Sequence, residues 1–400
     1  MSKKLSWVLT DTAKRVYVEN CTLGAAALGM DKDGAWTITK SRLRGGLSDG
    51  VDIIEVNNGQ LSFTIVPTRG MGLWRGSCGG HAIGWNSPAQ DLVNPAFINT
   101  LEQGGLGWLK GFNECIVRCG LNSNGAPGMD TVLDNNGNPS EVMLTLHGNI
   151  ANIPAKYVEV EVIPGTPTEL VITGVVEESR CFCPQYRMVC RYSTFVGSNK
   201  VSIRDEVSNF ADCPTEFQML YHCNFGEPFL EEGAKIVLPA AEVAPRDPRA
   251  AEDIDTWDSY RGYVPGYVEQ GYYLDVAADA QGRTLSMLKN RASTLGVVIR
   301  WDKAQLPSFC QWKHTTGASE GYVTGMEPSI NMPNLKSFER QKGRVLTLQP
   351  GQTYAIDLAM EIAGDAKAVA AVEAEVAAIM AGRKTTVQQQ PVAKWSPCAN

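Results

Sequence analysis

The sequence predicts an all-β fold, a large antiparallel β-sandwich followed by one helix near the C-terminus. Short strand-like segments separated by turn residues recur along the chain, and 39 Gly and 21 Pro residues supply those turns. The pattern lacks the amphipathic helices that would follow the strands of a parallel sheet. With 400 residues, 44% hydrophobic and 20% charged, the chain is long enough to bury one large core.

The individual strands follow from local patterning. Residues 51–56 and 61–66 are predicted strands, and Asn57-Asn58-Gly59-Gln60 between them is typical of a hairpin turn. Residues 157–163 alternate apolar and charged side chains, the period of a strand with one buried face. Further strands are expected at residues 169–176, 188–195, 200–209, 216–221, 296–301, 344–348 and 352–362.

The remaining segments complete a single domain over residues 1–382. Residues 365–381 are a predicted helix, because Ala, Glu and Val dominate a run without Gly or Pro. Residues 1–45 are expected to be an N-terminal extension packed against the sandwich, and the polar residues 383–400 a mobile tail. The glycine-rich residues 104–130 are expected to form a long irregular loop, which is where a β scaffold usually binds ligands.

Charge and cysteine content restrict the class of protein. The net charge is −7 and no basic run exists, which argues against a nucleic-acid partner. No apolar stretch suits a signal peptide or a membrane span, and the 11 scattered cysteines fit reduced thiols in the cytoplasm. The pairs Cys115/Cys119 and Cys181/Cys183 lack the partners of a four-ligand zinc site, so no metal is predicted.

Two of the four histidines lie in polar motifs beside predicted strands. His147 lies in Leu146-His147-Gly148-Asn149, and His222 in Tyr221-His222-Cys223-Asn224. Glu327 lies in Met326-Glu327-Pro328, a setting expected to desolvate its carboxylate partly and to raise its pKa. Two imidazoles and a carboxylate can supply an acid and a base at neutral pH. The alternatives are a core histidine bonded to backbone and a glutamate on a surface loop.

The order of these motifs resembles a known family. The aldose 1-epimerase (galactose mutarotase) superfamily, in particular an uncharacterised epimerase-like branch of it, is similar to this chain over residues 45–362. That resemblance rests on Pro67-Thr68-Arg69-Gly70-Met71, Gly84-Trp85-Asn86-Ser87-Pro88, Leu146-His147-Gly148, Tyr221-His222-Cys223-Asn224-Phe225-Gly226 and Met326-Glu327-Pro328. It implies a galactose mutarotase-like supersandwich with an open cleft on one sheet face. It also implies a small sugar as substrate and no metal or organic cofactor.

The resemblance further implies a role for each matching residue. His222 corresponds to the general acid, Glu327 to the general base, and His147 to a second histidine that helps to hold the ring oxygen. Arg69 corresponds more loosely to a substrate-binding arginine, although its residue type also suits a structural pair with a nearby acid. The acid and the base would then stand on opposite sides of a sugar-sized gap. The family's aspartate that contacts sugar hydroxyls has no counterpart in this sequence.

Other candidate substrate-binding residues come from residue type alone. Glu114 and Arg118 lie in the loop predicted at residues 104–130. Trp312 and Trp85 can stack on the apolar face of a sugar, although both suit a core equally well, and Lys313 can reach a hydroxyl or an acidic group.

Three hypotheses about function remain open. The first is an enzyme that interconverts sugar anomers by acid–base ring opening and reclosure. The second is a sugar isomerase that moves a carbon-bound proton next to the carbonyl group. The third is a non-catalytic carbohydrate-binding protein on the same scaffold. The sequence leaves the identity of the sugar, its charge and the oligomeric state open.

Overall fold

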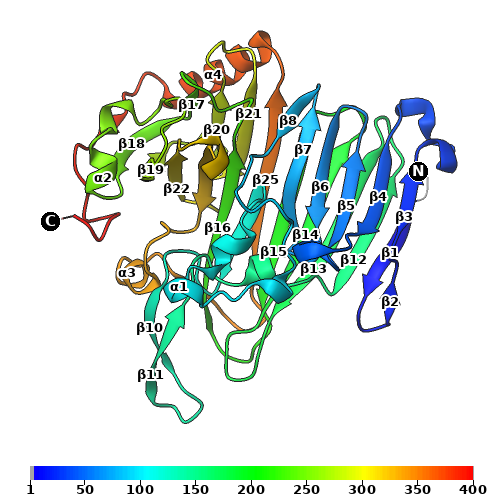
Figure 1. Cartoon of the computed structure of the whole chain (residues 1–400), viewed down its shortest axis with the longest axis horizontal. Coiled ribbons are helices and arrows are strands. Elements are labelled where there is room, and N and C mark those ends of the chain that lie inside the picture. Colours follow the sequence, from blue (N-terminus) through cyan, green and yellow to red (C-terminus); the bar gives the residue numbers. More distant parts are fainter. Residues whose placement is uncertain (1–3, 400) are drawn as a thin grey trace.

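The computed structural model describes residues 4–399, and within them the strands form two large sheets, of 10 and 14 strands, and one separate hairpin (Figure 1). The two sheets pack face to face around a continuous core, where Ile54 and Phe63 of one sheet join Ile172 and Met188 of the other. The predicted all-β sandwich is confirmed. No helix within residues 4–399 is long and apolar enough to cross a membrane.

The 10-stranded sheet forms one layer. Its strands in spatial order are β17 (Lys235–Val237), β20 (Arg283–Lys289), β21 (Gly296–Asp302), β25 (Thr353–Ala363), β15 (Lys200–Asn209), β14 (Tyr186–Phe195), β13 (Glu169–Glu178), β12 (Tyr157–Ile163), β1 (Leu5–Asp11) and β2 (Val16–Tyr17).

The 14-stranded sheet forms the other layer. Its main path runs through β26 (Thr386–Val387), β18 (Ala240–Pro245), β19 (Gln270–Val276), β22 (Ser308–His314), β23 (Val323–Ser329), β16 (Thr215–Phe225), β9 (Ile116–Leu121), β7 (Gly72–Cys78), β6 (Leu61–Val66), β5 (Asp52–Asn57), β4 (Thr37–Arg42) and β3 (Cys21–Gly24). Two short strands join it, β24 (Leu346–Leu348) beside β16 and β8 (His81–Ile83) beside β7. The separate hairpin is β10 (Gly128–Leu133) with β11 (Pro139–Leu144).

The helices are α1 (Glu102–Gly105), α2 (Pro248–Ala251), α3 (Lys336–Gln341) and α4 (Ala366–Met380). The predicted C-terminal helix is α4. Its first turn is capped by Asp365, whose carboxylate accepts a hydrogen bond from the backbone N–H of Ala368 at 2.8 Å. Its buried face, formed by Val369, Val372 and Val376, packs on the outer side of β20 and β21.

Three segments differ from the sequence-based expectation. The described part of residues 1–45 is integral to the sandwich, because β1 pairs with β12 and β4 pairs with β5. Residues 383–399 are held against the domain: β26 pairs with β18, and Trp395 packs on Tyr273, Cys310 and Met332. The expected loop at residues 104–130 contains β9, a strand whose residues are all buried. In each case partners distant in sequence supply the hydrogen bonds and packing.

Candidate active site

His222 and Glu327 lie side by side on neighbouring strands. β16 and β23 are antiparallel, and the register that pairs Cys223 with Met326 sets His222 opposite Glu327. Side chains alternate along a strand, so His222 faces away from the core that takes Tyr221 and Cys223. His222 Nε2 lies 3.2 Å from Glu327 Oε1. The structure thus brings together the two groups that the sequence singled out for acid–base chemistry.

A hydrogen-bond network fixes the imidazole of His222. Its Nδ1 lies 2.5 Å from Asn224 Oδ1, and the side-chain amide of Asn224 donates to the backbone carbonyls of Glu114 and His222, each at 3.0 Å. Because both of those partners are acceptors, the amide nitrogen faces them and the amide oxygen accepts from His222 Nδ1–H. Nε2 is therefore the nitrogen that exchanges a proton with a group on the Glu327 side.

His147 is the third member of the group. It lies on the turn between β11 and the short helix that follows, with a backbone φ of 58° that is uncommon for a residue with a side chain. Its Nδ1 lies 2.8 Å from the carbonyl oxygen of Asn124, and its ring centroid is 5.3 Å from that of His222. The turn therefore holds His147 in one orientation, beside the histidine–glutamate pair.

Aromatic side chains pack against both histidines. The ring centroid of Phe112 lies 5.0 Å from that of His222, and the centroid of Trp312 lies 5.3 Å from it. Trp108 lies 4.6 Å from His147, edge to face. Trp108 and Phe112 belong to the segment that connects α1 to β9, whereas Trp312 belongs to β22. Residues from both loop and sheet therefore enclose the site.

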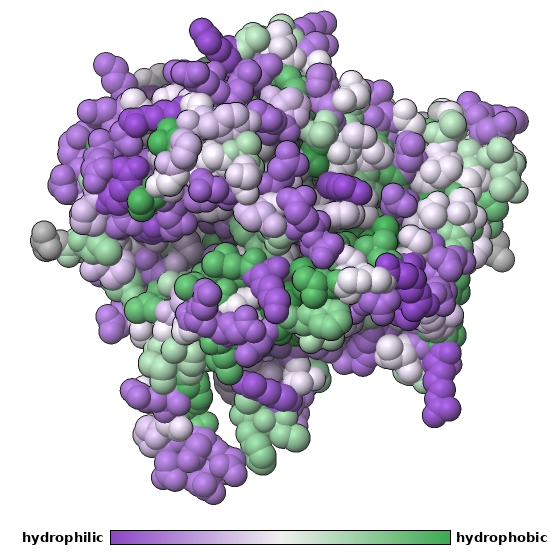
Figure 2. All heavy atoms as spheres, in the orientation of Figure 1, coloured by the Kyte–Doolittle hydropathy of each residue, from purple (hydrophilic) through white to green (hydrophobic). Residues whose placement is uncertain are grey.

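The site is closed in this structure. His222 is 5% exposed and Glu327 is 2% exposed. Their direct contact fills the sugar-sized gap that was expected between them. Leu101, just before α1, and Leu109, between α1 and β9, are exposed, and hydrophobic residues gather near the centre of the face in Figure 2. The aromatic rings pack on the histidines, and His147 and Trp312 keep part of their surface exposed beside the covered pair.

Burial sets the protonation of the group. Loss of water raises the pKa of Glu327 to about 8, a shift that a hydrogen bond from Cys310 opposes and the negative charge of Glu269 reinforces. Burial, and then the neighbouring His147, hold the pKa of His222 well below its usual value. Burial lowers the pKa of His147 to about 4. At neutral pH the His222–Glu327 pair therefore holds one proton, located on the carboxyl group.

Arg69 and Glu114 do not face this pair. Arg69 Nε lies 2.6 Å from Glu114 Oε1, and both side chains are 0% exposed. The other guanidinium nitrogens donate to the backbone carbonyls of Val93 and Gly111 and to the side chain of Asn152. This is the structural pairing that the sequence left as the alternative for Arg69. The backbone carbonyl of Glu114 in turn anchors Asn224, so the ion pair supports the site from behind.

Arg118 is also a core residue. It lies on β9 and faces the space between the two sheets, where its Nε is 2.6 Å from Asp205 Oδ2 and both side chains are 0% exposed. The same guanidinium donates to the hydroxyl of Tyr192 and to the carbonyl of Met71. The prediction that Arg118 contacts the substrate is therefore wrong for this structure, because the alternation along β9 turns its side chain inward.

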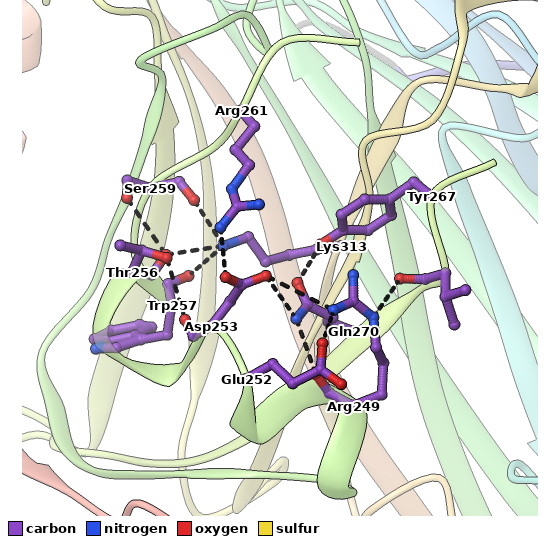
Figure 3. A network of polar contacts seen from close by, with 11 residues as sticks. Arg249, Glu252, Asp253, Thr256, Trp257, Ser259, Arg261, Tyr267, Gln270 and Lys313 are labelled. Atoms are coloured by element: carbon purple, nitrogen blue, oxygen red, sulfur yellow. Dashed lines mark hydrogen bonds and ion pairs between the residues drawn. The ribbon is translucent and has the colours of Figure 1, made fainter. Parts of the chain in front are cut away.

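Trp312 and Lys313 lie on opposite faces of β22. The indole of Trp312 faces His222, and its Nε1–H donates to Glu269 Oε2 at 2.7 Å. The ammonium group of Lys313 lies on the opposite side of β22 from Trp312, among backbone carbonyls of residues 256–259 (Figure 3). Burial lowers its pKa to about 8. Lys313 therefore tethers a loop and does not reach the site. Its acceptors are Thr256 at 3.0 Å, Trp257 at 3.1 Å and Ser259 at 2.6 Å.

Sequence reasoning missed two charged residues beside the site. Arg246 follows β18 and Glu269 precedes β19. One guanidinium nitrogen of Arg246 lies 3.0 Å from Glu269 Oε1, and Nε lies 2.9 Å from Asp247 Oδ2. Glu269 Oε2 also accepts the hydrogen bond from Trp312 Nε1–H. Neither residue belongs to a motif, and only the pairing of β19 with β22 brings them next to Trp312.

Comparisons with known proteins place the chain in a family. Residues 48–362 match a family model described as a domain of unknown function (DUF4432). The chain is similar to the structure of a protein from Klebsiella pneumoniae described as a "putative aldose 1-epimerase", with 36% identity over 98% of this chain and 99% of that chain and a TM-score of 0.92. No curated protein matches the chain.

More distant structures share the fold. A galactose mutarotase-like protein from Clostridium acetobutylicum is 14% identical over 81% of this chain and 98% of its own, with a TM-score of 0.56. A galactose mutarotase related enzyme from Lactobacillus acidophilus is 12% identical over 78% of this chain and 97% of its own, with a TM-score of 0.50.

Proposed function

We propose that this chain, which belongs to the family described as a domain of unknown function (DUF4432) and to the aldose 1-epimerase (galactose mutarotase) superfamily, interconverts the anomers of a free sugar. The observation that carries the proposal is the contact between His222 and Glu327 on adjacent strands, with His147 beside them. An acid and a base that share one proton are the groups that this reaction requires.

The reaction acts on two oxygens bonded to the same carbon. Glu327 takes the proton of the anomeric hydroxyl, the bond between the anomeric carbon and the ring oxygen breaks, and His222 Nε2 gives a proton to that ring oxygen. The resulting aldehyde rotates about its bond to the next carbon. The ring then closes with the two groups in reversed roles, which gives the other anomer. His147, whose Nδ1–H donates to the Asn124 carbonyl, presents an unprotonated Nε2 that accepts a hydrogen bond from a hydroxyl of the sugar.

The protonation of the pair suits a reversible reaction. Ring opening uses a carboxylate and an imidazolium, and ring closure uses the carboxylic acid and the neutral imidazole that opening leaves behind, so the one proton of the pair must move from Glu327 to His222 before a ring can open. In the closed site burial favours the arrangement with a neutral imidazole and a protonated carboxyl group. A sugar that enters between the two side chains replaces their direct contact with hydrogen bonds to its own hydroxyl and ring oxygen.

The charges around the site favour an uncharged sugar. Arg69 and Arg118 are committed to buried ion pairs, and Lys313 is held by backbone carbonyls. Arg246 lies between the carboxylates of Asp247 and Glu269, so its surroundings carry a net negative charge. A phosphate or carboxylate on the sugar would be repelled there. Neutral aldoses are therefore the first substrates to test.

The test follows freshly dissolved α-anomers of neutral hexoses and pentoses by polarimetry. We expect the wild type to equilibrate at least one of them faster than buffer does. The variants His222→Asn and Glu327→Gln should each lose about 10²–10⁴-fold in rate while remaining folded. Matched controls are His81→Asn and Glu55→Gln, which replace exposed residues of β8 and β5 and should keep full activity.

Three outcomes would contradict the proposal. Wild-type rates equal to buffer across the panel would reject anomer interconversion. Solvent deuterium appearing at a sugar carbon would instead identify an isomerase, because ring opening alone leaves C–H bonds intact. Thermal stabilisation by a sugar without any turnover would identify a carbohydrate-binding protein.

A further inference from the structure

The C-terminal segment crosses the sheet that carries the site. Residues 394–396, which we call the strap, lie beyond residues 48–362, the part of the chain that the family model matches. The indole of Trp395 packs on one residue from each of three neighbouring segments of this sheet. These residues are Tyr273 of β19, Cys310 of β22 and Met332, which follows β23.

Polar contacts hold the strap on both sides of the indole. The hydroxyl of Ser396, a residue that is 2% exposed, donates to the backbone carbonyl of Arg246. The side-chain amide of Asn334 donates to the backbone carbonyl of Trp395 at 2.8 Å, and its oxygen accepts from the hydroxyl of Tyr273 at 2.8 Å. These bonds fix the strap in one position on the sheet.

Trp395 covers the neighbour of the catalytic carboxyl group. Cys310 and Glu327 lie directly opposite each other on β22 and β23, and opposite residues of antiparallel strands project from the same face of a sheet. Burial raises the pKa of the Cys310 thiol, so the thiol keeps its proton and donates it in a hydrogen bond to Glu327. Cys310 and Glu327 are each 2% exposed. The indole therefore helps to keep water from the Glu327 side of the site.

The strap also reaches the histidine of the pair by a second route. Ser396 holds the carbonyl of Arg246, and the guanidinium of Arg246 lies 3.0 Å from Glu269 Oε1. Glu269 Oε2 accepts from Trp312 Nε1–H at 2.7 Å, and the centroid of the Trp312 ring lies 5.3 Å from that of His222. Two separate chains of contacts thus connect the strap to Glu327 and to His222.

The ionisation of Glu327 responds to both kinds of contact. Burial is the main cause of its raised pKa, so water admitted beside the carboxyl group would stabilise the charged form and lower that pKa. The hydrogen bond from Cys310 acts in the opposite direction, so its loss would raise the pKa of Glu327. The titratable and charged groups around Glu327 are His222 and Cys223 of β16, Cys119 of β9, Cys310 of β22, Tyr273 of β19, Arg246 and Glu269.

We propose that the strap is a positioning element of the active site, in which Trp395 keeps the Glu327 carboxyl group dry and thereby keeps the proton of the pair on it. Trp395 acts through Cys310, and Ser396 acts through Arg246. The catalytic consequence rests on the proposed function, whereas the effect on the ionisation of Glu327 does not.

The experiment titrates Glu327 directly by infrared difference spectroscopy, and Glu327→Gln identifies the band of its protonated carboxyl group. We expect the wild-type band to disappear with a midpoint near pH 8. Trp395→Ala should lower the midpoint by about one unit, a tenfold larger ionisation constant, and Trp395→Phe should restore most of the shift because an aromatic cover remains. Cys310→Ala should raise the midpoint. Phe182→Ala, which truncates an aromatic residue that is 81% exposed between β13 and β14, is the matched control.

The opposite signs distinguish the proposal from a general loosening of the sheet. An unchanged midpoint in Trp395→Ala, or shifts of the same sign in Trp395→Ala and Cys310→Ala, would overturn it. Ser396→Ala removes a single hydroxyl from the strap and should lower the midpoint by a smaller amount. If Trp395→Ala does not fold, an unchanged midpoint in Ser396→Ala would overturn the proposal in its place.

Anomer interconversion separates this proposal from the proposed function. In an active protein, the pH above which the rate falls should move with the midpoint of the band in each variant. A shifted band in a protein without this activity would support the role of the strap and reject the proposed function. Activity with an unshifted band in Trp395→Ala would overturn the role of the strap and leave the proposed function standing.

Discussion

Replacing Glu327 by glutamine is expected to stabilise the fold while it removes activity. Burial raises the pKa of Glu327 to about 8 in the folded protein, from a usual value of 4.5 that applies to the unfolded chain. The folded state therefore keeps a proton that the unfolded chain releases between those pH values. The stability of the wild type is complete below pH 4.5 and falls as the pH rises towards 8. Glutamine has nearly the same shape and no proton to lose.

The size of the effect follows from the two pKa values. Each pH unit between them lowers the free energy of unfolding by about 1.4 kcal/mol. Between pH 4.5 and pH 7 the wild type therefore loses at most about 3.4 kcal/mol of its free energy of unfolding, and this loss is the upper limit of the gain from glutamine. Hydrogen bonds that glutamine makes less well than the carboxyl group will reduce that gain. We therefore expect Glu327→Gln to unfold with about 1–3 kcal/mol more free energy than the wild type at pH 7, and with a difference near zero at pH 4.5.

The assay is urea unfolding at pH 4.5, 6, 7 and 8, followed by tryptophan fluorescence. Glu55→Gln, at an exposed position of β5, is the matched control and should leave the free energy of unfolding unchanged across the range. The reasoning would be refuted if the difference between Glu327→Gln and the wild type were independent of pH or shrank as the pH rose. A constant difference would mean that Glu327 ionises in the folded protein as readily as in the unfolded chain, and a shrinking one that it ionises more readily.

Three further predictions concern the site and its surroundings. The rate of anomer interconversion should fall above about pH 8, because the pair loses its one proton as Glu327 ionises, and a flat profile through pH 9 would contradict this. Arg118→Met should lower the free energy of unfolding by about 3–5 kcal/mol, because Asp205 is left buried without its partner, and should leave KM unchanged. A raised KM at unchanged stability would instead return Arg118 to the site. Cys310 is 2% exposed and packs against Trp395 of the C-terminal segment. Deleting residues 386–400 should therefore make the Cys310 thiol reactive to a thiol reagent, which peptide mass spectrometry would detect. Continued protection of Cys310 would mean that the C-terminal segment does not cover it.

Local patterning was sufficient for much of the fold. The hairpin of β5 and β6, the run of strands from β12 to β15 and helix α4 depend on alternation, turn residues and a cap, all of which are properties of neighbouring residues. The strands β9, β22 and β23 were not expected. β9 and β23 are buried along their whole length and β22 over most of it, and each carries polar residues on a buried face, so their sequences lack the alternation of a half-buried strand.

The sequence by itself determined which residue types could perform acid–base chemistry, and the structure places His222, Glu327, His147 and Trp312 together. Only the tertiary structure decided which charged groups reach them. The partner of Arg118 is Asp205, 87 residues away, and the partner of Arg69 is Glu114, 45 residues away. A charged side chain has the same composition and neighbours whether it binds a substrate or another side chain. Its role depends on the face of the strand it occupies and on which distant segment packs against that face.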